Sequence, residues 1–442
     1  MKKRNAFTLI ELLAVIVILA VILVIAIPRI LDVIETSKKD SFKNAAQLIA
    51  DSAEKKKASD KLLDKDEEIT CKDVAKISDE DYASCKISFD SEGNAKVSIT
   101  GRGKFDGLKI TNGTKENAEV KEITKPTYGM KATEYITNLL EYDGEGLKID
   151  NTPDQNIRYY GANPNNYVSF NNELWRIIGV FGNNVKLIRS EKLGNLSWDT
   201  SESSVNAGNG INEWSQADLK NYLNTMYYGG TTVTCYGGTN NQTTTCPTGT
   251  IDETSKSLID NHIWNTGAIA TIANQETFAL NTVPFYKAER GNETGKICSS
   301  GGWCNDTVTR TTTWTGYIGL PYVTDWAYAS SESACETNMN AGYNATASSD
   351  DEALANMTCK NNNWMHHGTT MDIEDATWVL SPVAYPGRAY GVWVVYGDGL
   401  VDDSSCATLP LSAFPTIYLK SNILIESGKG TSSDPYILKA GS

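Results

Sequence analysis

Residues 2–28 read KKRNAFTLIELLAVIVILAVILVIAIP, a basic tip followed by an apolar run that ends at Pro28. After the tip, Glu11 is the one charged residue before Pro28. A run of this length can cross a hydrocarbon core of about 30 Å as a single helix. A carboxylate inside such a helix costs about 2.5–3.5 kcal/mol on insertion scales, so Glu11 needs a partner.

The helical pattern continues beyond Pro28, because apolar residues recur at helical spacing as far as Ala53. We predict one helix from Phe7 to about Lys57, loosened at Pro28 by the missing backbone donor. The next segment, about 69–122, alternates as a strand over 95–101 and again over 108–110. The first quarter of the chain therefore reads as a long helix whose outer half packs on a small antiparallel sheet.

The opening stretch resembles the class III signal of type IV pilins and pseudopilins. This resemblance implies that a prepilin peptidase cuts between Ala6 and Phe7 and methylates the new amine of Phe7. Ala6 is a departure, because the family usually has Gly there. A secretory signal peptide fits less well, because no clean A-x-A site follows the apolar run and Glu11 interrupts it.

The resemblance also implies the role of Glu11. Its carboxylate would neutralise the Phe7 amine of a neighbouring subunit and so select the axial register during assembly, with Pro28 shaping the helix in the filament core. The alternative is a pair within one chain, since Phe7 and Glu11 are four residues apart and so lie one helical turn from each other.

Composition limits the class of protein. The chain has 442 residues, which suits two or three domains, and a formal net charge of −14, which disfavours nucleic acid as a direct partner. All nine cysteines follow the apolar run, on the side that the positive-inside rule places outside the cell, where disulfides form. The neighbouring pairs are Cys71/Cys85, Cys235/Cys246, Cys298/Cys304 and Cys335/Cys359, which leaves Cys406 over.

The remainder of the chain follows a linker near Lys125 and a short amphipathic helix that includes Ala132 and Leu140. Strands are predicted over 157–160, 167–170, 174–180 and 185–188, with Asn-Asn turns at 171–172 and 183–184. Helices are predicted over 214–224 and 256–263, and further strands over 376–382, 389–395 and 416–419.

Short motifs in this region resemble an uncharacterised bacterial surface domain that is distantly similar to formylglycine-generating-enzyme and C-type-lectin-like folds. The motifs are WRII at 175–178, WSQADLKNYLN at 214–224, WVLSP at 378–382 and PTIYL at 415–419, together with the segment 316–329. The resemblance implies long loops on a small twisted sheet, an arrangement that commonly carries binding sites.

The sequence offers little chemistry of its own. The pair His366-His367 lies near Asp372, Glu374 and Asp375, but such a pair in a polar loop is most often surface, and no metal site is expected. No catalytic arrangement with an interpretable spacing is present, so we expect no enzyme and no cofactor. Trp303 and Trp364 are the loop aromatics that we single out as candidate ligand contacts.

We therefore predict an α+β protein with a long pilin helix, a small antiparallel sheet and a large lectin-like domain with disulfide-bearing loops. Its expected parts are a leader (1–6), a membrane and filament-core helix (7–28), a pilin head (29–122), a linker with a short helix (123–150) and a large surface domain (151–442). The predicted function is that of a pilin-like subunit that polymerises and displays its large domain for adhesion or another surface interaction.

Two other functions stay open: a pseudopilin of a type II secretion or DNA-uptake apparatus, and a membrane-anchored sugar-binding module. The implied partners are prepilin peptidase, other pilin subunits, the assembly platform and host or surface glycans or proteins. The expected location is the cytoplasmic membrane before assembly, with the N-terminus inside, and then the extracellular filament.

Overall fold

The computed structural model describes residues 9–63, 68–142, 144–201, 209–238, 242–269, 281–291, 311–344, 346–367, 375–384 and 390–441. The chain forms two compact units. The small unit comprises Met1–Lys125 with Glu141–Asp143, and the large unit comprises Pro126–Leu140 with Gly144–Ser442. Each unit has its own hydrophobic core.

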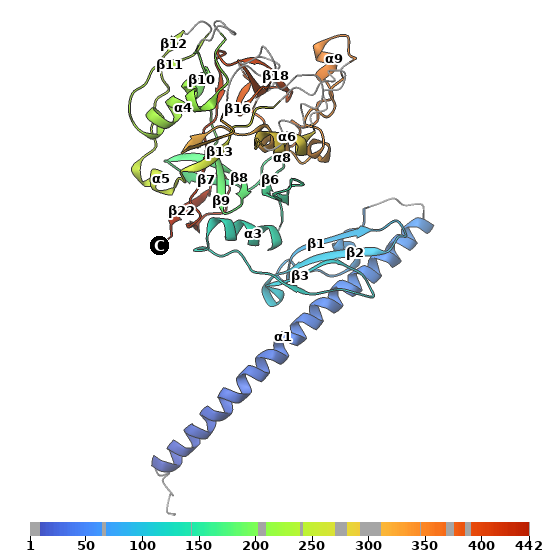
Figure 1. The fold of residues 1–442 in the computed structure, drawn as a ribbon. Helices are drawn as coiled ribbons and strands as arrows, with labels where there is room; N and C mark the ends of the chain where they lie inside the picture. Colours follow the sequence, from blue (N-terminus) through green and yellow to red (C-terminus); the bar gives the residue numbers. More distant parts are fainter. Residues whose placement is uncertain are drawn as a thin grey trace, which may run out of the picture. The chain divides into compact units, whose positions relative to one another are not determined.

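In the small unit, helix α1 (Leu9–Leu62) runs unbroken through Pro28 and is 54 residues long. Its second half packs on a four-stranded antiparallel sheet in the order β1-β2-β3-β4 (Figure 1). The other elements are α2 (Cys71–Val74), β1 (Tyr82–Phe89), β2 (Ala95–Gly101), η1 (Gly103–Phe105), β3 (Leu108–Gly113) and β4 (Lys121–Glu122). The predicted helix and the strands at 95–101 and 108–110 are found, and β1 is an additional strand.

The core of the small unit joins one stripe of α1 to the inner face of the sheet. Phe42 and Ala50 of α1 are fully buried, as are Val97 of β2 and Ile110 of β3. Small side chains on α1 let the sheet approach the helix closely, while the Phe42 ring packs against the ring of Phe105 at a centroid distance of 5.3 Å.

The large unit is built on two sheets. The first has nine strands, with the main order β15-β20-β9-β8-β7-β22-β21 and with β5 and β6 added beside β8. The second has five strands in the order β10-β19-β16-β17-β18. The predicted strands near 157–160, 167–170, 174–180 and 185–188 are β6, β7, β8 and β9. The mixed α+β class predicted from the sequence is confirmed.

The strands of the large unit are β5 (Leu147–Ile149), β6 (Ile157–Tyr159), β7 (Tyr167–Phe170), β8 (Glu173–Phe181), β9 (Asn184–Arg189), β10 (Gly194–Leu196), β11 (Cys235–Tyr236), β12 (Thr243–Thr244), β13 (His262–Asn265), β14 (Thr313–Gly316), β15 (Ile318–Gly319), β16 (Thr377–Pro382), β17 (Gly391–Val395), β18 (Val401–Cys406), β19 (Leu411–Ala413), β20 (Thr416–Tyr418), β21 (Ile423–Ser427) and β22 (Tyr436–Ala440). Its helices are α3 (Ala132–Tyr142), α4 (Asp218–Asn221), α5 (Glu253–Leu258), α6 (Thr282–Glu289), α8 (Val323–Ala329) and α9 (Asp350–Leu354), with short turns η2 (Trp214–Gln216) and η4 (Ser333–Glu336) and the π-helix η3 (Tyr222–Tyr228).

Two helix predictions need correction. The segment predicted as one helix over 214–224 is η2, α4 and η3 in succession, because Ala217 has an extended backbone with ψ of 140°. The helix predicted over 256–263 begins and ends earlier, as α5, and His262 already belongs to β13, which pairs with β14.

Replacing Phe42 with Ala should lower the free energy of unfolding of the small unit by about 3–5 kcal/mol, because the fully buried ring leaves a cavity. The measurement is hydrogen exchange of the β2 and β3 amides in increasing urea, on the detergent-solubilised chain. Leu48→Ala is the control, because Leu48 of α1 is 66% exposed and should change stability by no more than about 0.5 kcal/mol. Equal losses in the two variants would contradict the assigned core.

Candidate functional site

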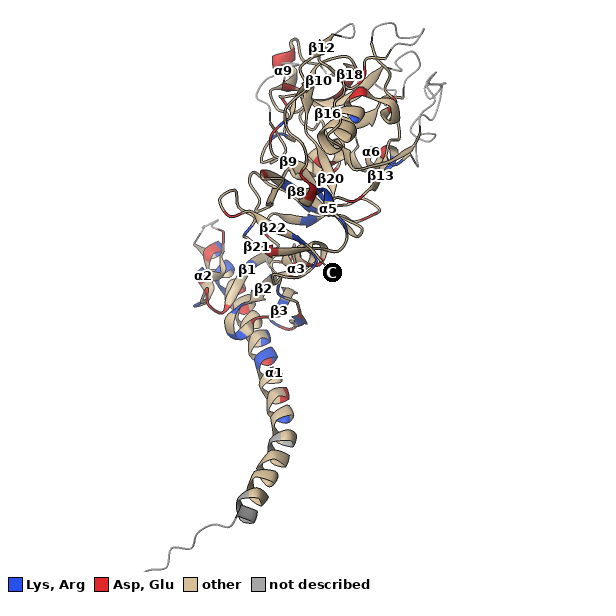
Figure 2. Ribbon diagram, turned by 90° about the vertical axis from the view of Figure 1, so that its left-hand side faces the viewer, with Lys and Arg blue, Asp and Glu red and all other residues tan. Residues whose placement is uncertain are grey.

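The first half of α1 carries an apolar surface that no other described part of the chain covers. From Leu13 to Ile34 its described Leu, Ile and Val side chains are 47–74% exposed. Figure 2 shows this part of α1 largely without charged residues, and charged residues gather on the half that carries the sheet. By length and composition, α1 is the one helix among the described residues that could cross a membrane, with a mean hydropathy of 3.0 in its most apolar window.

The residues of the processing motif are only partly described. Ala6 and Phe7 lie outside the described residues. Glu11 belongs to α1, but its side chain is outside the described part, so its pairing stays a prediction. Pro28 lies within α1, which continues on both sides of it. What the structure adds to the motif is the exposed apolar surface that follows it.

Three of the four candidate cysteine pairs form disulfides. Cys71 bonds to Cys85 in the small unit, and Cys235 bonds to Cys246 and Cys335 to Cys359 in the large unit. Cys298 and Cys304 lie outside the described residues. Cys406 ends β18 and is half-buried.

The two aromatic candidates have different outcomes. Trp303 lies outside the described residues. Trp364 is not the exposed loop residue that the sequence suggested, because it is 4% exposed and its indole N–H donates to the Tyr159 carbonyl at 2.8 Å. Within the described ranges, no group of three or more His, Cys, Asp and Glu side chains is arranged to hold a metal ion. Asp372 and Glu374 fall outside those ranges.

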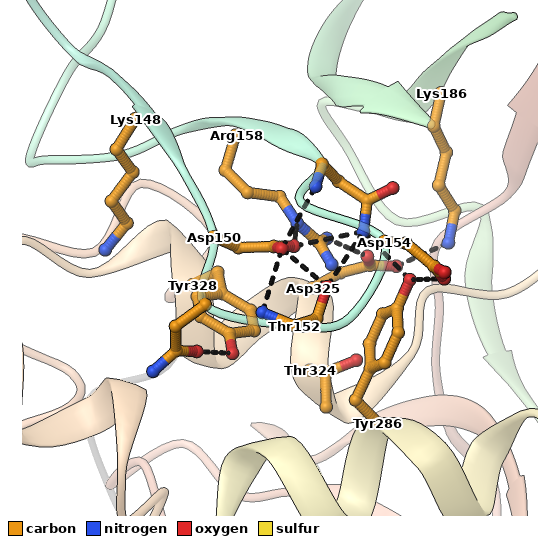
Figure 3. A network of polar contacts seen from close by, with 12 residues as sticks. Lys148, Asp150, Thr152, Asp154, Arg158, Lys186, Tyr286, Thr324, Asp325 and Tyr328 are labelled. Atoms are coloured by element: carbon orange, nitrogen blue, oxygen red, sulfur yellow. Dashed lines mark hydrogen bonds and ion pairs between the residues drawn. The ribbon is translucent and has the colours of Figure 1, made fainter. Parts of the chain in front are cut away.

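The sequence reasoning missed a buried network of charges in the large unit (Figure 3). Asp325 of α8 accepts from Arg158 of β6 at 2.6 Å and from Lys186 of β9 at 2.5 Å. All three side chains are at most 1% exposed. The backbone N–H of Tyr322 also donates to Asp325, at 2.9 Å. One carboxylate thus joins a helix to two strands of the nine-stranded sheet.

A second carboxylate completes the network. Asp150, just after β5, accepts from Nε of Arg158 at 2.8 Å and from the Thr152 hydroxyl at 2.6 Å. Asn156 donates to it through both its backbone and its side-chain N–H. The loop between β5 and β6 therefore folds around the carboxylate of Asp150. Because every carboxylate oxygen has donors, the network suits a fixed structural role rather than proton transfer.

The electrostatics of the network follow from burial and pairing. Burial alone would raise the pKa of Asp325, but Lys186 and Arg158 hold it below its ordinary value. Burial lowers the pKa of Lys186 to about 8, and Asp325 offsets part of this effect. Lys186 therefore stays charged at neutral pH, where it pairs with Asp325.

Asp325→Asn should destabilise the large unit by about 3–5 kcal/mol, because Lys186 and one side of Arg158 lose their counter-charge in a buried site. All ten tryptophans lie beyond Lys125, so urea unfolding followed by tryptophan fluorescence reports on this unit. Asp434→Asn is the control, because Asp434 pairs with Lys429 at 4.0 Å on the surface and should contribute at most about 1 kcal/mol. A loss under 1 kcal/mol for Asp325→Asn would contradict the assigned role.

A neighbouring buried carboxyl gives the unit a pH dependence. Glu289 is 1% exposed and accepts from the backbone and hydroxyl of Thr324, and burial raises its pKa to about 7 from an ordinary 4.5. The folded state then holds a proton that the unfolded state has lost. The contribution of Glu289 to stability should therefore fall as pH rises from 4.5 to about 7 and stay constant above.

Glu289→Gln should remove this dependence, a slope of at most about 1.4 kcal/mol per pH unit. The measurement is the free energy of unfolding of the native and variant chains across the same pH window, by tryptophan fluorescence. The difference between the two curves isolates Glu289 from the other carboxyls. Parallel curves would show that Glu289 is ionised in the folded protein.

Comparison with known proteins identifies only the N-terminus. Residues 1–27 match the family described as the prokaryotic N-terminal methylation motif. No curated protein and no solved structure matches the chain, so the similarity of the large region to formylglycine-generating-enzyme and C-type-lectin-like folds has no support. The matched motif and the exposed apolar α1 together indicate a pilin-like substrate of prepilin peptidase, consistent with membrane anchoring and later surface exposure.

Proposed function

We propose that this chain is a pilin-like structural subunit without enzymatic activity. Prepilin peptidase would cut it between Ala6 and Phe7 and methylate Phe7, and the assembly platform would then move it from the cytoplasmic membrane into a filament. The observation that carries the proposal is the division of α1: its second half is covered by the sheet, while its first half exposes side chains that only lipid or other copies of α1 can cover.

The two environments fit two stages of one process. In the membrane, the exposed part of α1 spans the hydrocarbon core. In the filament, the same side chains pack against α1 of neighbouring subunits, and the Glu11 carboxylate meets a Phe7 amine of another copy. The sheet of the small unit and the large unit remain in water, where disulfides such as Cys71–Cys85 persist.

The large unit is then the displayed part, and adhesion or another surface interaction is its proposed role. Its core contains most of the buried apolar residues of the chain, so it folds around its own interior rather than around the filament. A pseudopilin of a secretion or DNA-uptake apparatus is the second candidate, since it would use the same processing and the same exposed helix.

Glu11→Ala should leave cleavage intact and reduce assembly at least about tenfold, because an amine without its carboxylate partner remains in an apolar filament core. Mass spectrometry of the membrane-bound subunit should give an N-terminus at methylated Phe7 in both the native and the variant chain. Electron microscopy and protein assay of sheared surface filaments measure assembly.

Glu35→Ala is the matched control, because Glu35 is exposed on the same helix and pairs with Lys39 at the surface. It should assemble normally. Normal filament yield from Glu11→Ala would contradict the assembly role of Glu11. Cleaved subunit in the membrane without any sheared filament from the native chain would favour the pseudopilin.

A further inference from the structure

The large unit has a hollow of about 580 Å³ whose wall includes a buried arginine that has no counter-charge among the described residues. Arg176 of β8 is 7% exposed, yet its four hydrogen-bond acceptors are all neutral oxygens. A buried charge normally pairs with an opposite one, because desolvation is otherwise uncompensated. By contrast, the buried cations of the charged network, Arg158 and Lys186, both pair with the carboxylate of Asp325.

The guanidinium is held in a fixed position. Its Nε donates to the Asn166 side chain at 2.8 Å, and its Cζ lies 4.2 and 4.5 Å from the ring centroids of Tyr167 and Trp364. Asn166 is fully buried and is itself fixed by a bond to the Ile177 carbonyl. The bonds from Nη1 and Nη2 are long, 3.3–3.4 Å, and only one of the two N–H groups of Nη1 has an acceptor among the described residues.

The nearby charges leave Arg176 unbalanced. The other arginine of the hollow, Arg189, is neutralised by Glu173 at 2.5 Å and by two backbone carbonyls. Burial lowers the pKa of Arg176 to about 10, with no carboxylate opposing the effect, so the group is still charged at neutral pH. The two arginines and two glutamates of the hollow balance in number, but no described carboxylate pairs with Arg176 itself.

The remaining wall of the hollow mixes polar side chains with apolar ones such as Leu174 and Trp364. The hydroxyl of Ser190 is buried with no hydrogen-bond partner among the described residues, and Glu173 and Glu191 supply acceptors. These carboxylates would repel a ligand with several negative charges, such as a phosphate ester. A ligand with one carboxylate and several hydroxyl groups fits this wall better. Its carboxylate would pair with Arg176, and its hydroxyl groups would meet the Ser190 hydroxyl and the glutamate oxygens.

We propose that this hollow binds a sugar acid, with its carboxylate on Arg176 and a ring hydroxyl on Ser190. The volume is several times that of a bare carboxylate ion and falls in the range of small-ligand sites. The site lies wholly within the large unit, so it does not depend on whether α1 assembles into a filament.

The test is binding of glucuronate to the full chain in detergent, by isothermal titration calorimetry or saturation-transfer NMR. Glucose is the matched ligand, because it has the same ring without the carboxylate. Glucuronate should bind at least about tenfold more tightly than glucose, and Arg176→Gln should weaken it at least about tenfold, as expected for a charge-assisted hydrogen bond. Arg102→Gln, an exposed arginine of the small unit, should leave binding unchanged.

Ser190→Ala provides a second variant in case Arg176→Gln does not fold, which near-ultraviolet circular dichroism will show. It should weaken glucuronate binding a few-fold, as loss of one neutral hydrogen bond does. Absence of glucuronate binding, or equal binding of glucose, would overturn the proposal. Binding of a tripeptide with a free C-terminus but not of glucuronate would overturn the sugar class. Filament assembly is measured separately, so failure here leaves the proposed assembly role standing.

Discussion

The large unit depends on one carboxylate, that of Asp325, which accepts from two buried cations on different strands. Arg158 and Lys186 come from β6 and β9, which are not hydrogen-bonded to each other, and α8 is held to both through Asp325. Burying these charges singly would cost several kcal/mol each, so they are tolerated only together. The position of α8, and of the loop that Asp150 organises beside it, follows from this requirement.

In the small unit the governing constraint is hydrophobic. Helix α1 is apolar on all sides in its first half and amphipathic in its second, where Phe42, Ala46 and Ala50 face the sheet and are fully buried. A helix that is apolar all round has to be covered, in a membrane or by other helices. The sheet covers only the second half, so no described part of the chain covers the apolar side chains of the first half. That is the structural reason for the proposed assembly.

Local patterns predicted much of the fold. The strands β6 to β9 are predicted because their segments are rich in Ile, Val, Leu, Tyr and Phe and because Asn171 and Asn172 mark a tight turn, in which both have positive φ, 55° and 56°. The helix over 214–224 was wrong in detail, because a backbone turn at Ala217 is set by tertiary contacts such as the packing of Trp214 on Trp198. Trp364 was taken as exposed, because its loop context gave no sign of the Arg176 guanidinium that covers it.

The charged network could not be predicted, because its members are far apart in sequence: Arg158 and Asp325 are separated by 167 positions. The available signal was a charge inside an apolar strand, as for Lys186 among Val185, Leu187 and Ile188. Such a charge indicates that an oppositely charged partner exists, but it does not indicate where in the sequence that partner lies. The same signal is present for Arg176 in Trp-Arg-Ile-Ile, and there the structure provides no charged partner among the described residues.

The distribution of exposed apolar side chains separates the two roles of the chain. On α1 they gather along one stretch of helix from Leu13 to Ile34, whereas in the large unit the exposed large ones, such as Ile149, Leu174 and Ile263, come from separate elements. Single exposed apolar residues are ordinary on a surface in water, but a long continuous run is not. The proposed association through apolar contact is therefore assigned to α1, and the proposed recognition by the large unit is assigned to polar groups. The hollow at Arg176, where a charge and a hydroxyl lack partners within the described chain, is the place that best meets that condition.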